Sequence, residues 1–318
     1  MQKMPVVLDV DTGIDDALAL LYALASDRLD VRGITTCFGN GDVETTTRNT
    51  LAVVSLAERG APVYQGAAHP LVGQWEPSAE AFHGTDGLGG YAFTPQGIAV
   101  QAQSAVQYLG EVTQELSGEI VLIATARLTN IAAALTAHPE MVRRVKRLVI
   151  MGGAAFVGGN VTPVAEANIW GDPEAAWIVF HSGMPITMVG LDVTMQVRIS
   201  DAMLETLDPR RPYAAMLKGA VDFYLGAYNP GRLIGDRTAP LHDPLAVAVA
   251  EEPDLCDTIP YAVDIERYGT LTRGMTVVDR REWLPLRPNI DVAVGVDRDR
   301  FMTTFARRLG FDDRIIEG

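Results

Sequence analysis

The chain has 318 residues, 48% of them hydrophobic, and its 40 Asp and Glu outnumber its 26 Lys and Arg, for a formal net charge of −14. This length and composition allow a large buried core, in one α/β domain or two smaller ones. The acidic balance argues against nucleic acid as a partner, because such binding relies on clustered Lys and Arg. It suits an enzyme that acts on a small neutral substrate.

No apolar run approaches the roughly 20 residues that a membrane span needs. Near the N-terminus, Asp9 ends the apolar stretch too early for a signal peptide. Cys37 and Cys256 lie far apart in the sequence, so we expect no disulfide framework and a reducing compartment. The sequence therefore predicts a cytoplasmic protein with no membrane partner.

Short apolar strand-like runs alternate with helical patterns along most of the chain. The expected strands are 5–8, 31–36, 62–64, 120–125, 147–151, 186–189, 276–279 and 291–294, and the expected helices are 17–24, 43–59, 100–116, 129 onward, 173–181 and 213–228. Residues 66–97 form a long Gly-rich loop. Repeated β–α units predict a mostly parallel central sheet flanked by helices, with a Rossmann-like core. We see no linker and expect one α/β domain over residues 1–318.

The first strand runs directly into a cluster of acids. Four carboxylates fall within eight positions: Asp9, Asp11, Asp15 and Asp16. No Lys, Arg or His lies between residues 4 and 27 to neutralise them, and Thr12-Gly13 makes the bend into the helix. Helix capping favours each carboxylate by only about 0.3–1 kcal/mol, whereas removing one from water costs several kcal/mol. The cluster therefore indicates a bound divalent cation.

The candidate ligands in this region are all oxygen atoms. Five scattered histidines and two unpaired cysteines disfavour zinc, and an oxygen-only site suits Ca²⁺, Mg²⁺ or Mn²⁺. Asn40, Thr125 and the 152–172 loop also follow strand ends. Because ligands of parallel sheets bind beyond the carboxyl ends of the strands, we expect these segments to meet the acidic turn in one crevice.

A phosphatase is the competing interpretation of the first motif. Asp9-Val10-Asp11-Thr12 is similar to the aspartyl-phosphate loop of haloacid-dehalogenase-type phosphatases. That pattern requires Thr or Val where this chain has Gly13, and it gives no reason for the following Asp-Asp pair. Fingerprints of P-loop and dinucleotide-binding proteins are absent.

Further motifs follow the acidic turn in a fixed order, out to about residue 250. They are Asp9-Val10-Asp11-Thr12-Gly13-Ile14-Asp15-Asp16-Ala17, Gly39-Asn40, His83-Gly84-Thr85-Asp86-Gly87, Leu128-Thr129-Asn130, Met151-Gly152-Gly153, Gly159-Asn160, Glu166-x-Asn168, Asp172-Pro173-Glu174-Ala175 and His242-Asp243-Pro244. Together these segments resemble the inosine–uridine-preferring nucleoside hydrolase family.

The resemblance implies Ca²⁺-dependent hydrolysis of the N-glycosidic bond of ribonucleosides to free base and ribose, by a homodimer or homotetramer. It implies that the calcium ligands are the carboxylates of Asp11, Asp16 and Asp243 and the backbone carbonyl of Thr125, with Asp11 also serving as general base. It places Asp15, Asn40 and Asn168 at the ribose, Asn160 and Glu166 at its 5′-hydroxyl, and His242 at the base as proton donor. His83 is expected either to face the substrate or to bond only backbone, and Tyr224 and Tyr228 either stack on the base or pack in the core.

Three positions depart from the family pattern. Thr12 replaces a usual Pro, Ala126-Arg127 replaces Gly-Pro, and Ala167 replaces an aromatic residue. An inward Arg127 would place a cation near the calcium, so we expect it to point away or to meet an acid. These departures leave two alternatives open: a non-catalytic homologue that binds metal and ribose, and a hydrolase of another N-riboside that a larger pocket at Ala167 would admit.

Overall fold

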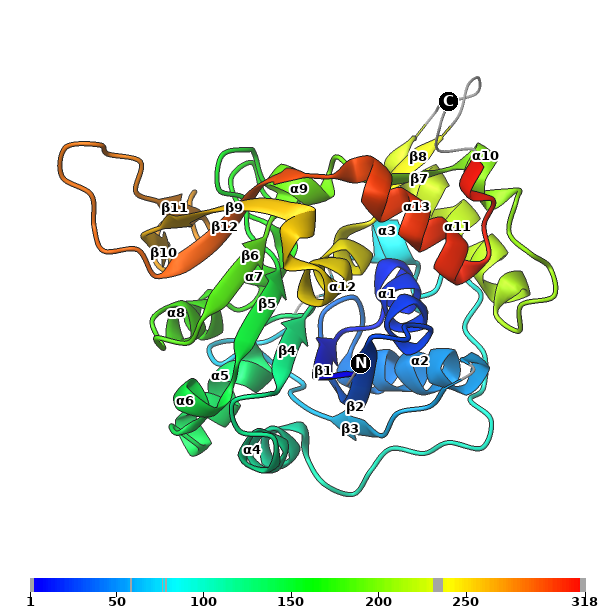
Figure 1. The fold of residues 1–318 in the computed structure, drawn as a ribbon, viewed down its shortest axis with the longest axis horizontal. Coiled ribbons are helices and arrows are strands. Elements are labelled where there is room, and N and C mark those ends of the chain that lie inside the picture. Colours follow the sequence, from blue (N-terminus) through cyan, green and yellow to red (C-terminus); the bar gives the residue numbers. More distant parts are fainter. Residues whose placement is uncertain (1–2, 58, 76, 78, 231–236, 315–318) are drawn as a thin grey trace.

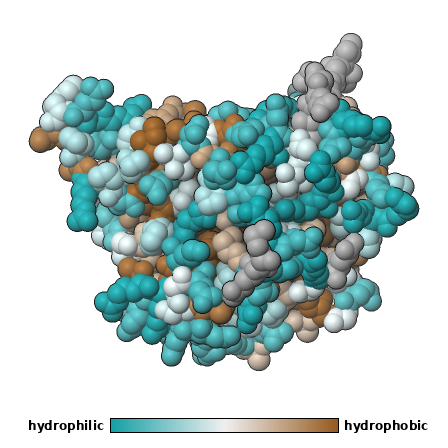
Figure 2. All heavy atoms as spheres, in the orientation of Figure 1, coloured by the Kyte–Doolittle hydropathy of each residue, from teal (hydrophilic) through white to brown (hydrophobic). Residues whose placement is uncertain are grey.

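The computed structural model describes residues 3–57, 59–75, 77, 79–230 and 237–314. The ends of the expected 1–318 domain, part of the 66–97 loop and one residue of the expected 43–59 helix therefore lie outside the described residues. Within the described ranges, no helix combines the length and the apolar character that crossing a membrane would take. The face shown in Figure 2 is mostly hydrophilic, with hydrophobic atoms scattered between polar ones.

An eight-stranded sheet forms the centre of the molecule (Figure 1), in the order β3-β2-β1-β4-β5-β6-β12-β9. Its strands are β1 (Met4–Val10), β2 (Leu29–Thr36), β3 (Val63–Gln65), β4 (Val121–Ala124), β5 (Arg147–Met151), β6 (Ile186–Val189), β9 (Cys256–Tyr261) and β12 (Ile290–Val296). Every neighbouring pair is parallel except β12 with β9. The prediction of a mostly parallel α/β fold is confirmed.

Helices cover both faces of this sheet. They are α1 (Ile14–Leu24), α2 (Val43–Leu56), α3 (Glu80–His83), α4 (Ala105–Glu115), α5 (Thr129–Ala137), α6 (Met141–Arg144), α7 (Ala167–Gly171), α8 (Pro173–Phe180), α9 (Leu191–Thr194), α10 (Asp201–Leu204), α11 (Ala214–Tyr228), α12 (His242–Glu251) and α13 (Arg298–Leu309). One apolar core joins the sheet to α1, α11, α12 and α13, and a second joins it to α4, α5 and α8. Two small antiparallel pairs lie outside the sheet, β7 (Arg198–Ser200) with β8 (Thr238–Pro240) and β10 (Val263–Ile265) with β11 (Thr276–Val278).

Most expected elements are present with shifted ends. The first helix begins at Ile14, so the acidic pair lies inside its first turn. The expected 100–116 helix begins only at Ala105, because Ser104 caps it by accepting a hydrogen bond from the Gln107 backbone N–H. Helices α12 and α13 were not predicted. All of α12 is buried, so it lacks the polar face that marks a helix in a sequence.

The order of the strands reverses at β1, which has β2 on one side and β4 on the other. Helix α1 packs in one core, whereas α4 and α5, on either side of β4 in the chain, pack in the other. The segments that leave the carboxyl ends of β1 and β4 therefore diverge to opposite faces and open a crevice between them. Asp11 follows the end of β1, and Thr125 follows the end of β4.

A buried ion pair between Arg308 and Glu251 connects helix α13 to α12. Arg308 donates hydrogen bonds of 2.7 and 3.1 Å to the two carboxylate oxygens of Glu251, whose side chain is 2% exposed. The Ser26 hydroxyl, beyond the end of α1, donates to the same carboxylate at 3.0 Å. The guanidinium also lies over the Tyr22 ring, 4.0 Å from its centroid. One arginine thus links three helices on this face of the sheet.

We predict that Arg308→Met lowers the free energy of unfolding by about 3 kcal/mol, because it leaves the buried carboxylate of Glu251 with only the largely exposed Arg28, 3.8 Å away, as a counter-ion. Arg307→Met is the matched control, since Arg307 is 73% exposed in its pair with Asp313 and should change stability by less than about 0.5 kcal/mol. Urea unfolding of both variants measures the difference. Equal effects would show that the α13 ion pair does not stabilise the fold.

Candidate active site

A cavity of about 510 Å³ opens at the carboxyl ends of the central strands. This volume is in the range of small-molecule sites. Nine of the predicted site residues line it: Asp15, Asn40, His83, Thr125, Asn160, Glu166, Asn168, His242 and Asp243. The convergence of the strand ends that we expected from the sequence is therefore found.

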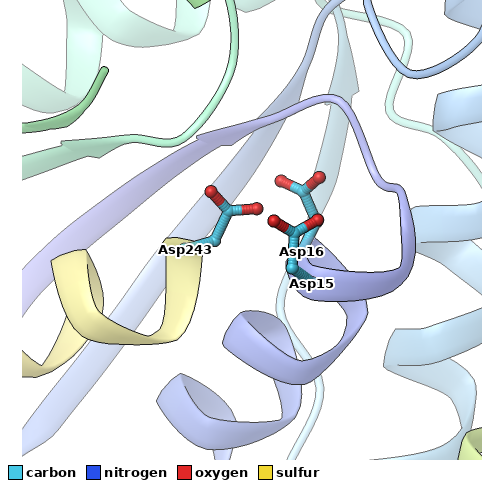
Figure 3. Close-up of side chains that lie close together, drawn as sticks. All are labelled: Asp15, Asp16 and Asp243. Atoms are coloured by element: carbon cyan, nitrogen blue, oxygen red, sulfur yellow. The ribbon is translucent and has the colours of Figure 1, made fainter. Parts of the chain in front are cut away.

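The floor of the cavity is acidic. One oxygen each of Asp15, Asp16 and Asp243 lie within 4.8 Å of one another, and all three side chains are buried (Figure 3). Asp15 and Asp16 come from the first turn of α1, and Asp243 comes from the first turn of α12. Two helix N-termini thus direct carboxylates toward the same point.

Asp11 and Asp16 are both fully buried and are bonded to the lining of the cavity. The Asp16 carboxylate accepts hydrogen bonds from the Gly13 backbone N–H at 3.0 Å, the Asn40 amide at 3.1 Å and the Thr125 hydroxyl at 2.8 Å. Asp11 accepts from the Asn40 backbone N–H at 2.9 Å. One oxygen of Asp11 and one of Asp15 are buried without a partner.

Burial is the largest influence on these acids. It raises the pKa of Asp15 to about 7, with repulsion from Asp16 adding to the shift. Burial likewise raises the pKa of Asp16, and it raises those of Asp11 and Asp243 well above the usual range of a carboxyl group. The ionised carboxylates are therefore destabilised when no counter-charge is present. A multivalent cation would stabilise them.

The Arg127 side chain points toward the cavity and pairs with a carboxylate. Its guanidinium forms an ion pair with Asp11, the residue predicted to be both metal ligand and general base, and donates to the Asn168 side-chain oxygen at 3.3 Å. The side chain is almost fully buried, and its Nε has no partner. Space for it depends on Gly171, because a Cβ there would lie 2.7 Å from Nε. Of the two positions expected for Arg127, the structure thus shows the one that contacts an acid.

The turn after β1 is shaped by close contacts. A Cβ on Gly13 would lie 2.6 Å from Nδ1 of His83 and 2.7 Å from the Asn40 amide nitrogen, so only glycine fits. His83 accepts a hydrogen bond from the Ile14 backbone N–H at 3.1 Å and also lines the cavity, which combines its two expected roles. Thr12, in place of the usual Pro, is held by a 2.6 Å hydroxyl–hydroxyl hydrogen bond to Thr50 of α2.

Glu166 and Asn168 form another wall. Glu166 caps α7 and accepts hydrogen bonds from the backbone N–H groups of Gly153 (2.9 Å), Asn168 (2.9 Å) and Ile169 (3.2 Å). The Asn168 amide donates to the carbonyl oxygens of Thr125 at 2.7 Å and Met151 at 3.1 Å. The Thr125 carbonyl, the predicted calcium ligand, is therefore engaged by Asn168.

Aromatic rings form the opposite wall. Tyr228 lies 4.9 Å from Tyr224 and 5.0 Å from Phe82 between ring centroids, and all three line the cavity. His242 joins them: its Nε2 is 3.2 Å from the Tyr228 hydroxyl and its Nδ1 is 2.7 Å from the Thr194 hydroxyl. Burial lowers the pKa of His242 to about 3. Phe82 and Thr194 were not predicted, because neither lies in a recognisable motif.

Comparison with known proteins agrees with this geometry. Residues 6–303 match the family described as inosine-uridine preferring nucleoside hydrolase. The pyrimidine-specific ribonucleoside hydrolase RihA of Salmonella paratyphi B is 40% identical over 310 residues, which cover 97% of this chain and 99% of that protein. The plant nucleoside hydrolase PpNRh1 matches with a TM-score of 0.91 and 36% identity, covering 97% of this chain and 99% of that one. A purine-preferring ribonucleoside hydrolase from Gardnerella vaginalis matches with a TM-score of 0.88 and 37% identity, covering 96% of this chain and 98% of that one.

The buried His83 predicts a specific acid sensitivity. Burial lowers its pKa from 6.5 to about 3 in the folded chain, so as the pH falls the unfolded chain binds this proton first. The stability that a neutral His83 contributes is therefore present above about pH 6.5 and is lost as the pH falls toward 3. Between about pH 7 and about pH 4, in EDTA, the free energy of unfolding of His83→Asn should fall by about 3 kcal/mol less than that of wild type. Urea unfolding over this range tests it. The carboxylates titrate alike in both proteins, so identical pH slopes would contradict the assignment.

Proposed function

The chain belongs to the inosine-uridine preferring nucleoside hydrolase family and is an N-glycosidase of ribonucleosides, and we propose that it cleaves them with the help of one Ca²⁺. The observation that carries the proposal is the group of buried carboxylates at a cavity that Phe82, Tyr224 and Tyr228 also line. The acidic floor suits a cation and a sugar, and the aromatic wall suits a nucleobase. The family supports a small-molecule ribonucleoside as the substrate.

The residues present fit a hard divalent cation. Three carboxylate oxygens within 4.8 Å of one another are compatible with one ion whose ligands lie at 2.3–2.6 Å. The unpartnered oxygens of Asp11 and Asp15 supply further donors. We propose Asp11, Asp16, Asp243 and the Thr125 carbonyl as ligands. Asp15, one of the three clustered carboxylates, can contribute as well.

A cation held by these residues would supply Lewis acidity toward the nucleophilic water and the sugar hydroxyls. Asp11 would accept the proton of the attacking water through its carboxylate oxygen that has no hydrogen-bond partner among the described residues. Asp15, Asn40 and Asn168 bind the ribose, and Asn160 and Glu166 lie at its 5′ end. Positive charge develops on the sugar in an oxocarbenium-like transition state, and carboxylate and amide oxygens at the cavity wall stabilise it.

We assign proton donation to the leaving base to His242. Its ring is neutral in the free enzyme, because burial lowers its pKa to about 3. The ring donates as the imidazolium: negative charge on the departing base raises the pKa of the ring in the enzyme–substrate complex, so His242 takes up a proton from solvent and passes it to the base as the glycosidic bond breaks. Thr194 and Tyr228 hold the two ring nitrogens in place.

The preferred base follows from neither the cavity nor the relatives. One similar protein is described as pyrimidine-specific and another as purine-preferring. Ala167, which lines the cavity where the family usually has an aromatic residue, leaves extra room there. This observation favours hydrolysis of a larger or modified N-riboside as the second candidate function. A panel of ribosides that includes base-modified ones distinguishes the two.

We also propose that the protein is a cytoplasmic homo-oligomer. The arm between β11 and β12 projects from the body of the molecule (Figure 1) and exposes Trp283, Leu284 and Leu286. These apolar side chains support assembly into a homodimer or homotetramer, which sedimentation would measure. Both cysteines are buried and unpaired, which supports a cytoplasmic location.

We predict that the protein releases free ribose from uridine or inosine in the presence of Ca²⁺. This release should stop after treatment with EDTA. Asp11→Asn should lower kcat by about 10²–10⁴-fold, because it removes the general base and one metal ligand. Asp297→Asn is the control, since Asp297 caps the remote helix α13 and Asn caps equally well. Near-normal turnover of Asp11→Asn would remove Asp11 from the mechanism. Riboside binding without any ribose release, measured by calorimetry, would support the non-catalytic alternative instead.

His242→Asn should slow purine and pyrimidine ribosides unequally, because their leaving groups accept the proton at different atoms. The larger loss should reach about 10²–10⁴-fold in kcat, as expected for a lost general acid. Tyr228→Phe keeps the ring and removes only one hydrogen-bond partner of His242, so it should cost less. Steady-state kinetics with uridine and inosine measure kcat for wild type, His242→Asn and Tyr228→Phe. Equal, small losses in His242→Asn would show that another group protonates the base.

A further inference from the structure

Arg127 occupies a place that the proposed metal also needs. Its guanidinium is paired with Asp11, and both side chains are at most 3% exposed. Among the described residues, Arg127 is the cationic side chain that pairs with Asp11, next to the acidic floor. A divalent cation that takes Asp11 as a ligand meets this fixed positive charge on the same carboxylate, where little solvent screens the repulsion.

A second cavity lies on the other side of Arg127. It has a volume of about 290 Å³, and Arg127, Trp75, Trp170 and Gly171 are among the residues that line it. Arg127 also lines the active-site cavity, so its side chain separates the two spaces. The second cavity has about ten times the roughly 30 Å³ that one water molecule occupies in the liquid, which is room for a guanidinium group.

The contacts that hold Arg127 on Asp11 are few, and the second cavity can receive a cation. Among the described residues, Nε has no partner, and the hydrogen bonds of the guanidinium go to Asp11 and Asn168. The other arginine of the second cavity, Arg273, is paired with Glu174 at 3.0 Å, which offsets its charge. Tryptophan rings offer a favourable surface to a guanidinium.

We propose that Arg127 is a resident counter-cation of Asp11, which divalent metal must displace toward the cavity beside Trp75 and Trp170. It stabilises the metal-free protein and weakens metal binding. This inference rests on the calcium site proposed above and adds a residue that sets its affinity. Arg127 is thus a positioning residue for Asp11, and it takes no part in bond cleavage.

The test is calorimetric titration of Ca²⁺ into the full chain after removal of metal with a chelator. Arg127→Met should bind Ca²⁺ at least about tenfold more tightly than wild type, the change that ~1.4 kcal/mol represents. Arg127→Lys, which retains the charge, should stay closer to wild type. Arg307→Met removes an exposed arginine far from the site and should bind as wild type does.

Two further measurements separate competition from a general effect of charge. In chelator, Arg127→Met should have a lower melting temperature than wild type. Added Ca²⁺ should raise the melting temperature of Arg127→Met by more than that of wild type. Tryptophan emission of wild type should change with Ca²⁺ as Arg127 approaches Trp75 and Trp170, and this change should be lost in Arg127→Met.

The outcomes are distinct. Equal Ca²⁺ affinities in wild type and Arg127→Met, or calcium binding to wild type without a change in emission, would overturn the role of Arg127 and leave the calcium site standing. Absence of Ca²⁺ binding in every protein would overturn the calcium site and this inference with it. If Arg127→Met does not fold without metal, Arg127→Gln decides the question, because it also removes the charge but keeps an amide that can donate to Asp11, and it should bind Ca²⁺ more tightly than wild type.

Discussion

Mutual repulsion among buried carboxylates is the constraint on which the rest of this structure depends. Asp11, Asp15, Asp16 and Asp243 are all at most 6% exposed, and burial raises the pKa of each. Burial of one carboxylate costs several kcal/mol. Two helix N-termini offset part of this cost, but each contributes only about 0.3–1 kcal/mol to a nearby carboxylate, up to about 2 in buried geometries. The arrangement is therefore unfavourable without a further positive charge.

The scaffold maintains that arrangement because its rigid elements leave little freedom to relax. Helices α1 and α12 pack side by side and are buried along their whole lengths, so the acids at their first turns cannot separate without disrupting the core. Strand β1 lies between two parallel neighbours, which fixes the start of the acidic turn. Stability gained in the apolar core thus maintains a strained polar site, as is common where chemistry is carried out.

The sequence predicted the parts of the site that are local. Asp11, Asp15 and Asp16 share one strand–turn–helix unit, so their proximity follows from short-range geometry. Asp243 lies more than two hundred positions downstream, and nothing in periodicity connects it to the first strand; only the family resemblance placed it there. Helix α12 was missed because it has no polar face, whereas α13 has one, with Phe301, Phe305 and Leu309 at helical spacing, and could have been found. The inward position of Arg127 could not be derived, because the room for it is made by Gly171, which is distant in sequence.

Protons, Arg127 and a metal ion are three ways to compensate the same negative charge. Burial raises the pKa of Asp15 to about 7, so the metal-free site takes up a proton there near neutral pH, and Arg127 offsets the charge of Asp11 while the metal is absent. A cation that binds must displace the protons, so its affinity should rise with pH. Of the departures from the family pattern, Arg127 is the one that acts on this balance. Thr12 is compensated by its bond to Thr50 and leaves the turn intact, whereas Arg127 adds a charge that the usual proline does not carry. The change that matters here is therefore electrostatic, and it affects how strongly the site holds its metal more than which bond it cleaves.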